Sequence, residues 1–322
     1  MLKRALAVAL LLLSQAAFAQ SYPSKTVRLV NPFPPGGPLD LLGRVLSERL
    51  TTALGKPVIV DNRPGAAGNI GAAEVARSVP DGHTVLLTLF SIVTCNPHLY
   101  DRLPFDPLKD FAPVIALAGS DSVLIAHPSV PANSVQELIA YARSNPGRLN
   151  YASAGTASPG HLTAEYFRLQ TGVQFTHVPY KGNAEAIRSV LAGDAQLMFT
   201  PTTGALAHIQ AGKLKALAVY LVDSVPELRG VKSLDAQGIK GFDQKSLPFW
   251  YGMLVPARTP REAVKVLNAE TIKVLKDPQV AETLRAARVF PMGSTPEEFG
   301  QMMRDGYAAW GKVIRETGVK GE

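Results

Sequence analysis

The first stretch whose residue types suit ligand chemistry is a loop rich in proline and glycine, Asn31-Pro-Phe-Pro-Pro-Gly-Gly-Pro-Leu-Asp40. Gly36 and Gly37 have no Cβ, so the backbone can turn sharply there and direct its N–H groups toward a ligand at a helix N-terminus. Unpaired amides and the helix dipole favour an anion at such a position. Two alternatives stay open: the glycines form a plain turn, or Asp40 is only the N-cap of the helix.

A second stretch of the same kind, Asn150-Tyr-Ala-Ser-Ala-Gly-Thr-Ala-Ser-Pro-Gly-His161, also lies between an expected strand and an expected helix. Ser153, Thr156 and Ser158 supply hydroxyls, and Gly155 and Gly160 free the backbone for the same presentation of amides. Each loop alone is weak evidence, because clusters of Ser, Gly and Pro usually form turns. Two such loops facing each other across a cleft would hold a small anion.

Enzyme chemistry has one candidate nucleophile and base, Ser153 and His161, which stand eight residues apart across a turn. A histidine at a helix start is more often a capping or packing residue. The chain has no Gly-x-Ser-x-Gly elbow, no Walker loop and no Gly-x-Gly-x-x-Gly turn, and its six histidines lack the spacing of metal ligands. The absence of these motifs removes the common enzyme classes but does not by itself exclude an enzyme. Our expectation is no catalytic residues, no metal and no cofactor.

The elements that would position these loops alternate in type along the chain. Short apolar runs rich in β-branched residues predict strands at 26–30, 58–60, 84–89, 114–117, 123–126, 149–152, 176–178, 195–199, 217–222 and 249–255. Patterns of helical period predict helices at 40–54, 69–78, 135–143, 161–171, 184–191, 204–211, 260–276, 279–287 and 296–316. This order is typical of an α/β fold with mostly parallel sheets flanked by helices.

The length of 322 residues suits two domains. We expect residues 123–223 to form one domain, inserted between the two parts of the other, 20–122 and 224–322. The net charge of +7 is spread without runs of one sign, which gives no support to nucleic acid binding. The single cysteine, Cys95, has no partner and is expected to be inert in a packed loop.

The N-terminus has the features of a secretory signal. Lys3 and Arg4 precede an apolar stretch at 5–13, and Ala17-Phe-Ala19 forms a small-x-small cleavage site. The apolar stretch is too short to span a bilayer. No cysteine follows the cleavage site, so we expect a periplasmic protein without a lipid anchor, after removal of residues 1–19.

A set of short motifs follows in order from Tyr22 to Val319. They are Pro32-Phe-Pro-Pro-Gly-Gly37 with Asp40, Asp61-Asn-Arg-Pro-Gly65 with Gly68-Asn-Ile-Gly71, Pro80-Asp-Gly82, Phe105-Asp-Pro107, Lys109-Asp-Phe-Ala-Pro113, Tyr151-Ala-Ser-Ala-Gly155, His177-Val-Pro-Tyr-Lys-Gly182, Ala211-Gly-Lys-Leu214 and Gly293-Ser-Thr-Pro-Glu-Glu298. No one motif is decisive. In this order, they resemble those of the Bug-type periplasmic solute receptors of tripartite tricarboxylate transporters.

This resemblance implies a type II periplasmic binding protein of two domains that close like a flytrap on a small carboxylate, held mainly by backbone amides. The implied ligand-binding residues are Phe33, Pro34, Pro35, Gly36, Gly37 and Asp40 in the first loop, Ser153, Ala154, Gly155 and Thr156 in the second, and Thr88, Phe90, Ser91, Tyr180 and Thr200 around them. The implied function is that of a monomeric receptor that delivers its ligand to membrane transport subunits. A ligand-sensing partner of a membrane sensor kinase and an exported hydrolase are the alternatives.

Two positions bear on the ligand itself. The segment from Thr88 to Val93 is more apolar than its counterparts in the family, which favours a ligand with an apolar body, although Phe90 and Phe249 could equally be core residues. Thr200 stands where family members often place Asp, and a hydroxyl cannot neutralise a buried ammonium group. We therefore expect a carboxylate without an α-amino group, unless Asp40, Glu165 or Glu185 supplies the missing charge.

Deleting residues 1–19 is expected to leave a soluble, folded protein that stays in the cytoplasm, because this segment only directs export. Sequencing the N-terminus of the exported protein tests the cleavage site, and the expected first residue is Gln20. A periplasmic protein that still begins at Met1 would contradict it.

Overall fold

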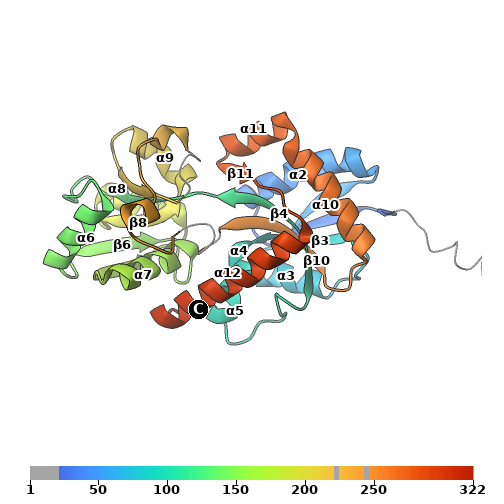
Figure 1. The fold of residues 1–322 in the computed structure, drawn as a ribbon, viewed down its shortest axis with the longest axis horizontal. Helices are drawn as coiled ribbons and strands as arrows, with labels where there is room; N and C mark the ends of the chain where they lie inside the picture. Colours follow the sequence, from blue (N-terminus) through green and yellow to red (C-terminus); the bar gives the residue numbers. More distant parts are fainter. Residues whose placement is uncertain (1–21, 221–224, 243–246, 248, 322) are drawn as a thin grey trace, which may run out of the picture.

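The computed structural model describes residues 22–220, 225–242, 247 and 249–321, and within them the chain forms two lobes, each built on one β-sheet (Figure 1). The strands are β1 (Val27–Asn31), β2 (Val58–Asn62), β3 (Thr84–Leu89), β4 (Phe111–Ser120), β5 (Ser122–Ala126), β6 (Leu149–Ser153), β7 (Phe175–Pro179), β8 (Leu197–Pro201), β9 (Lys215–Val219), β10 (Trp250–Pro256) and β11 (Val289–Pro291). The helices are α2 (Pro38–Leu54), α3 (Asn69–Ala76), α4 (Phe90–Thr94), α5 (Asn96–Leu99), α6 (Val135–Ser144), α7 (Pro159–Thr171), α8 (Asn183–Ala192), α9 (Thr202–Gln210), α10 (Arg261–Lys276), α11 (Pro278–Ala286) and α12 (Pro296–Thr317).

The larger sheet has the strand order β11-β4-β10-β3-β1-β2, and the smaller has β7-β6-β8-β5-β9. In the larger sheet β1, β2, β3 and β4 run in one direction, against β10 and β11. In the smaller sheet only β5 opposes the other four strands. Most strands of each described sheet run in one direction, as the alternation of strands and helices predicted. However, β10, β11 and β5 run against their neighbours, so three of the five neighbouring pairs in the larger sheet and two of the four in the smaller are antiparallel, and both sheets are mixed.

Helix α2 shows why these residues form these elements. Leu42, Leu46 and Leu50 recur at helical spacing and are fully buried against the larger sheet. Gly55 ends the helix in a left-handed conformation, with φ of 65°, and its N–H bonds to the carbonyl of Thr51.

Three short elements differ from the expectation. The segment after β3, expected to be a loop, folds into α4 and α5 on either side of the fully buried Cys95. The third is β11, a three-residue strand at Val289–Pro291 that pairs with β4. None of the three is long enough to show a hydrophobic period, so tertiary packing and not local pattern decides them.

Burial raises the pKa of the Cys95 thiol to about 12, so the thiol is protonated at neutral pH.

The hydrophobic core continues from one lobe into the other. One cluster of buried side chains includes Val30 and Leu86 of the larger sheet together with Leu124 and Tyr151 of the smaller. Separate clusters lie on the other face of each sheet. The two lobes are thus joined by packed apolar side chains as well as by the segments of chain that pass between them.

Aromatic rings fill this junction. Phe90 on α4 is 1% exposed, and its ring centroid lies 4.8 Å from that of Phe249 and 5.6 Å from that of Trp310 on α12. Tyr220, just after β9, packs edge-on against Phe249 at 4.7 Å. Of the two interpretations left open for Phe90 and Phe249, the structure supports the core.

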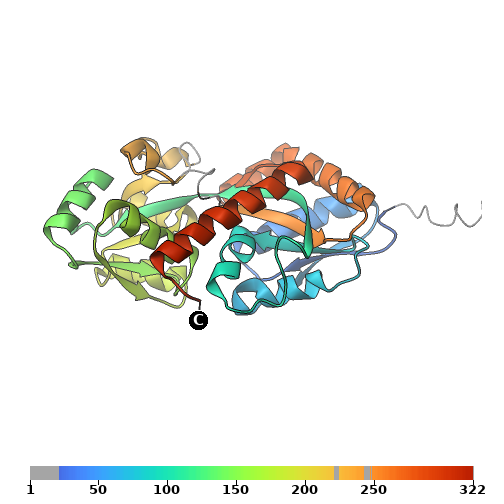
Figure 2. The same cartoon turned by 60° about the horizontal axis from the view of Figure 1, so that its bottom comes forward.

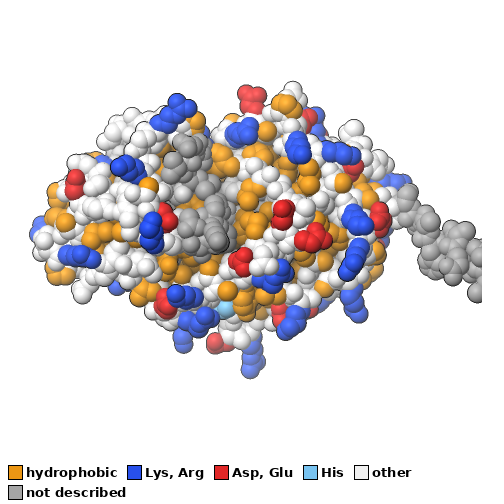
Figure 3. All heavy atoms as spheres, in the orientation of Figure 1, with side chains coloured by type: hydrophobic (Ala, Val, Ile, Leu, Met, Phe, Trp, Pro, Cys, Tyr) orange, Lys and Arg blue, Asp and Glu red, His pale blue; other side chains and the backbone are white. Residues whose placement is uncertain are grey.

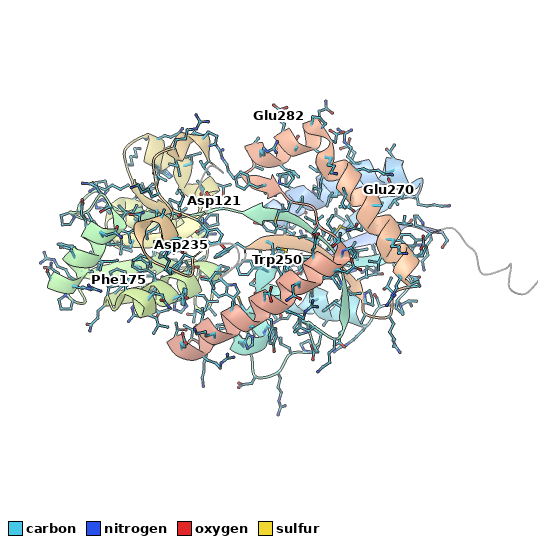
Figure 4. All side chains as sticks on the ribbon, in the orientation of Figure 1. Asp121, Phe175, Asp235, Trp250, Glu270 and Glu282 are labelled. Carbon is cyan, nitrogen blue, oxygen red and sulfur yellow. The ribbon has the colours of Figure 1, made fainter. Side chains whose placement is uncertain are left out.

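The chain passes between the lobes at Asp121, which separates β4 from β5 and is labelled in Figure 4. The return crossing lies between β9 and β10, and the predicted boundary at 223/224 falls outside the described residues. Residues 225–242 pack on the smaller lobe: Val225 and Leu228 join its core, and Gln237 hydrogen-bonds the carbonyl of Leu217. The domain limits remain a prediction, and we propose the return crossing after residue 242.

Helix α12 lies diagonally across the larger lobe and reaches α7 of the smaller one, as both Figure 1 and Figure 2 show. Its first turn carries a capping box, in which the Thr295 hydroxyl accepts from the amide of Glu298 and the Glu298 carboxylate accepts from the amide of Thr295.

The predicted export signal, residues 1–19, lies outside the described residues, as do the last two residues of the expected strand 217–222. Among the helices that are described, none is both long and apolar enough to cross a membrane. On the face shown in Figure 3, acidic and basic side chains are interspersed over both lobes, in agreement with the absence of charge runs in the sequence.

Trp310→Ala is expected to lower the free energy of unfolding by about 3–5 kcal/mol, because it leaves a large cavity in the aromatic junction. Urea unfolding followed by circular dichroism measures the change. Leu169→Ala, at a side chain that is 44% exposed on α7, serves as the control and should change stability by less than about 1 kcal/mol. Equal losses for the two variants would show that the junction contributes little to stability.

Candidate functional site

The first loop, residues 32–37, is held in shape by the carboxylate of Asp40. This side chain is 4% exposed and accepts hydrogen bonds from the Gly36 N–H at 3.1 Å, from Nε of Arg44 at 2.8 Å and from Nδ2 of Asn62 at 3.1 Å. Asn62 also donates to the carbonyl of Phe33 at 3.1 Å. The carboxylate therefore ties the loop to α2 and to the end of β2.

Asp40 remains ionised at any physiological pH. Burial by itself would raise the pKa of its carboxyl, but the hydrogen bond from Arg44, followed by those from Gly36 and Asn62, lowers the pKa to about 2. The alternative interpretation of Asp40 as the N-cap is wrong: the helix begins at Pro38, and Gly37 is the N-cap. Asp40 acts from the first turn of the helix and reaches back to the loop.

This arrangement divides the amides of the loop into two groups. The N–H of Phe33 donates to the side chain of Asn31, and the N–H of Gly36 donates to Asp40, so both point inward. The first hydrogen bond of the helix runs from Leu41 to Gly37. The amides of Gly37, Leu39 and Asp40 therefore have no acceptor among the described residues. Of the two glycines expected to bind a ligand, Gly36 has its N–H hydrogen-bonded to Asp40, whereas the N–H of Gly37 has no acceptor among the described residues.

A cavity of about 360 Å³ lies at these free amides. Its lining consists of Phe33, Pro34, Pro35, Gly37, Pro38, Leu39, Asp40, Leu89 and Tyr251. Parallel strands bring the loop after β1 and the end of β3 to one edge of the sheet, and the antiparallel β10 places Tyr251 opposite Leu89. Five of the six first-loop residues expected from the sequence line this cavity, and Gly36 lies directly beside it in the chain.

The second loop, at 154–158, has a similar internal support. Ser153 ends β6, is fully buried, and its Oγ lies 2.9 Å from the carbonyl oxygen and 3.2 Å from the amide nitrogen of Gly155. The same Oγ lies 2.7 Å from Nε2 of His177. Gly155 has φ of 127°, a left-handed value that a residue with a Cβ rarely adopts, so the turn requires glycine here.

The outward amides of this loop are those of Ala154 and Thr156, which have no acceptor among the described residues. The N–H of Ala157 donates to Nδ1 of His161 at 2.9 Å, and the N–H of His161 donates to the N-cap Ser158. Gly160 was expected to free the backbone for ligand binding. The structure gives it another role, because a Cβ there would lie 2.4 Å from the carbonyl oxygen of Phe199, so it permits α7 to pack closely on β8.

The remaining predicted residues lie at the same sheet edges. Thr88 is buried at the end of β3 and donates to the carbonyl of Leu89, and Ser91 lies half-buried on α4. Tyr180 follows β7, and its N–H donates to the carbonyl of Ser153 at 3.0 Å. Thr200 is buried on β8, where its hydroxyl has no hydrogen-bond partner among the described residues.

Sequence reasoning missed several residues that shape the site. Arg44 and Asn62 hold Asp40, Tyr251 lines the cavity, and His177 contacts Ser153, whereas Leu89 falls within the segment 88–91 that was expected to line the site. Asn62 and His177 stand within motifs that carried the family resemblance, so a signal for them was present in the sequence. Arg44 stands four residues after Asp40, the spacing of a helical ion pair.

In the structure the candidate nucleophile, Ser153, contacts a histidine other than the expected base His161. Ser153 contacts His177, while the ring of His161 stacks on that of His177 with centroids 3.9 Å apart. Among the described residues, no group of three or more His, Cys, Asp or Glu side chains is placed to hold a metal ion.

Comparison with solved structures shows where this fold recurs. A structure of an R. palustris protein with adipate is 32% identical in sequence, has a TM-score of 0.78, and covers 93% of this chain and 99% of its own. MatC from Rhodopseudomonas palustris with bound malate is 27% identical, has a TM-score of 0.75, and covers 91% of this chain and 100% of its own. The expected fold class, a two-domain periplasmic binding protein with sheets flanked by helices, is thereby confirmed.

Comparison of sequences agrees with the structural result. The protein BugT of Bordetella pertussis is 32% identical over 303 residues, which is 94% of this chain and 92% of BugT. The family model for the tripartite tricarboxylate transporter family receptor matches residues 42–319. The family resemblance seen in the sequence motifs is confirmed, and the chain belongs to the tripartite tricarboxylate transporter receptor family of solute-binding proteins.

Proposed function

We propose that this protein is an extracytoplasmic receptor that binds a small carboxylate between its two loops and delivers it to membrane transport subunits. One observation carries the proposal: the amides of Gly37, Leu39 and Asp40 lie at a cavity and have no acceptor among the described residues. Free N–H groups at a helix start bind anions, because each brings a partial positive charge. The free amides of Ala154 and Thr156 would contact the ligand from the other lobe.

The chemistry of the ligands in related structures supports a carboxylate. One structural neighbour holds adipate and another holds malate, and both are small dicarboxylates. The resemblance between their folds and this one extends over more than 90% of the chain. We infer that this chain acts in the periplasm after removal of its signal segment; its monomeric state stays a prediction.

The charges around the site favour a ligand without an ammonium group. Asp40 is paired with Arg44 and Asn62, and Glu165 is paired with Arg168 at 2.6 Å and with the hydroxyl of Tyr151. Glu185 accepts from the N–H of Lys181 at 3.0 Å. The three carboxylates that could have neutralised an α-amino group are therefore engaged in local hydrogen bonds.

The body of the ligand would meet a largely apolar wall. Phe33, Leu89 and Tyr251 line the cavity from three separate segments, and Pro34, Pro35 and Pro38 complete that side. Apolar surface of this kind stabilises a hydrocarbon chain or an aromatic ring by removing it from water. We propose a carboxylate with an apolar body, such as an aliphatic dicarboxylate or an aromatic acid.

The geometry at Ser153 argues against the hydrolase alternative. A serine nucleophile must be accessible and must give its proton to a base. Ser153 is fully buried, and its hydroxyl proton is directed to the carbonyl of Gly155. The nearby His161 already uses Nδ1 to accept from Ala157. We therefore propose a receptor that performs no chemistry.

Calorimetric titration of the exported protein with adipate, terephthalate, benzoate and glutamate tests the ligand class. Adipate or one of the aromatic acids is expected to bind at least about tenfold more tightly than glutamate, because the α-ammonium of glutamate would be desolvated without a free anionic partner. Tight binding of glutamate alone would contradict the assignment of charges around the site.

Gly37→Val is expected to weaken carboxylate binding by about tenfold or more, because the added side chain would stand at the free amides. The backbone of Gly37 is extended, with φ of −83°, and a Cβ built there meets nothing within 4 Å, so the fold should tolerate valine. Gly36 is a poorer test, since its φ of 92° would be strained by any side chain.

Thr52→Val, on the exposed face of the same helix, is the matched control and should leave affinity unchanged. Thermal unfolding of both variants separates a binding defect from a folding defect. If Gly37→Val binds the ligand within a factor of three of the unmodified protein, the loop is only a turn.

A further inference from the structure

Behind the second loop lies a cluster of titratable side chains to which the proposed function assigns no role. His177 on β7 stacks on His161 of α7 with the ring planes 7° apart, and Tyr151 of β6 lies 4.8 Å from His177. Glu165 and Arg168, both on α7, form an ion pair beside these rings. The register of β6 and β7 explains the proximity, because Tyr151 pairs with His177 across the two parallel strands.

The hydrogen bonds of Ser153 determine where His177 carries its proton. A hydroxyl has one proton to donate and two lone pairs to accept with. The carbonyl of Gly155 can only accept, at 2.9 Å, and the amide of Gly155 can only donate, at 3.2 Å. The remaining contact, with Nε2 of His177 at 2.7 Å, is therefore one in which His177 donates.

The second histidine is fixed in the same way. Nδ1 of His161 accepts from the N–H of Ala157, so a neutral His161 carries its proton on Nε2. That nitrogen lies 4.0 Å from a carboxylate oxygen of Glu165. Burial, and then the proximity of His177, lowers the pKa of His161 to about 4, and burial lowers the pKa of His177. Both rings are therefore uncharged at neutral pH.

We propose that His177 is a positioning residue for ligand binding: its Nε2–H fixes Ser153, Ser153 closes the turn at Gly155, and this turn directs the free amides of Ala154 and Thr156 into the cleft. The proposal rests on the proposed function, since it assigns a role in the same site. His161 supports the opposite end of the loop through Ala157, so the stacked pair holds the loop at two points.

The arrangement has a consequence for pH dependence. Protonation of His177 keeps its bond to Ser153, because Nε2–H is present in both charge states, and it adds a positive charge behind the loop. The groups that face this ring are Tyr151, His161, Glu165 and Arg168. A bound carboxylate favours the protonated ring, so binding takes up a proton and affinity rises as pH falls through the pKa of His177.

The first arm of the test needs no ligand. Long-range 1H–15N spectra of the exported protein at pH 7.5 report which nitrogen of each imidazole is protonated, and the spectrum of His177→Gln assigns the resonance of His177. The expected result is an uncharged His177 protonated at Nε2. A ring protonated only at Nδ1 would overturn the inference whatever ligand binds.

The second arm measures binding of adipate and terephthalate by calorimetry. His177→Leu removes the donor and is expected to weaken binding about tenfold, whereas His177→Gln, whose amide can donate from a similar position, should stay within about threefold. His208→Gln, on α9, is the control and should bind like the unmodified protein. Thermal unfolding shows whether the leucine variant is folded. If the leucine variant is not folded, the glutamine variant and the pH comparison test the inference instead.

The pH comparison uses the ratio of affinities of the unmodified protein and His177→Gln at pH 7.5 and at a lower pH at which the 15N spectrum shows His177 protonated, and the titration of the ligand itself cancels in this ratio. The ratio should rise about two- to threefold at the lower pH, a modest effect expected of a charge that acts through the loop. An unchanged ratio, or a folded His177→Leu variant with undiminished affinity, would overturn the inference. If neither probe binds the unmodified protein while Nε2 of His177 is protonated, the proposed function has failed instead.

Discussion

Asp40 enters the interior at the first turn of α2 as a charged side chain, and the shape of the first loop depends on how that charge is satisfied. Its oxygens accept from a loop amide, from an arginine one turn along the helix and from Asn62 at the end of the neighbouring strand. A buried carboxylate without these donors would cost several kcal/mol, so the three donors fix the loop in one conformation. Because the charge is neutralised locally, the adjoining free amides keep their attraction for an anion.

Both loops keep some backbone amides free for a ligand and remain stable, but they do so with different supporting groups. Each must leave some backbone N–H groups without a protein acceptor, yet a chain with many unsatisfied amides is not stable. In the first loop three prolines lack an amide hydrogen, as does Pro38 at the start of α2, and the side chains of Asn31 and Asp40 accept from two of the remaining amides. In the second, the uncharged side chains of Ser153 and His161 accept from the inward amides. The first loop thus has a charged support and the second an uncharged one.

The packing between the lobes sets a limit on how they can move. Phe90, Tyr220, Phe249 and Trp310 form a continuous aromatic contact at the junction, and Trp250, labelled in Figure 4, is buried nearby at the start of β10. A densely packed core resists small deformations. If the lobes close on a ligand, as the proposed function requires, we expect the packing of this junction to be kept.

The sequence by itself determined the type and order of the long elements, because an apolar period is a local property of the chain. The helices α2, α10 and α12 and the strand β3 follow their predicted limits within two residues, and the two loops were found as breaks between such periods. Most of the first loop was also predicted, since Phe33, Pro34, Pro35, Gly37 and Asp40 are neighbours in the chain and remain neighbours at the cavity.

Tertiary structure decided which amides face outward and which side chains hold them. Asn62, Tyr251 and His177 come from strands far along the chain, and only sheet pairing brings them to the loops. Phe90 was equally compatible with a ligand site and with the core until packing against Phe249 and Trp310 placed it in the core. Hydrogen bonds and packing between distant segments depend on strand order and register. Strand order and register are properties of the whole fold, so they cannot be predicted from a local sequence pattern.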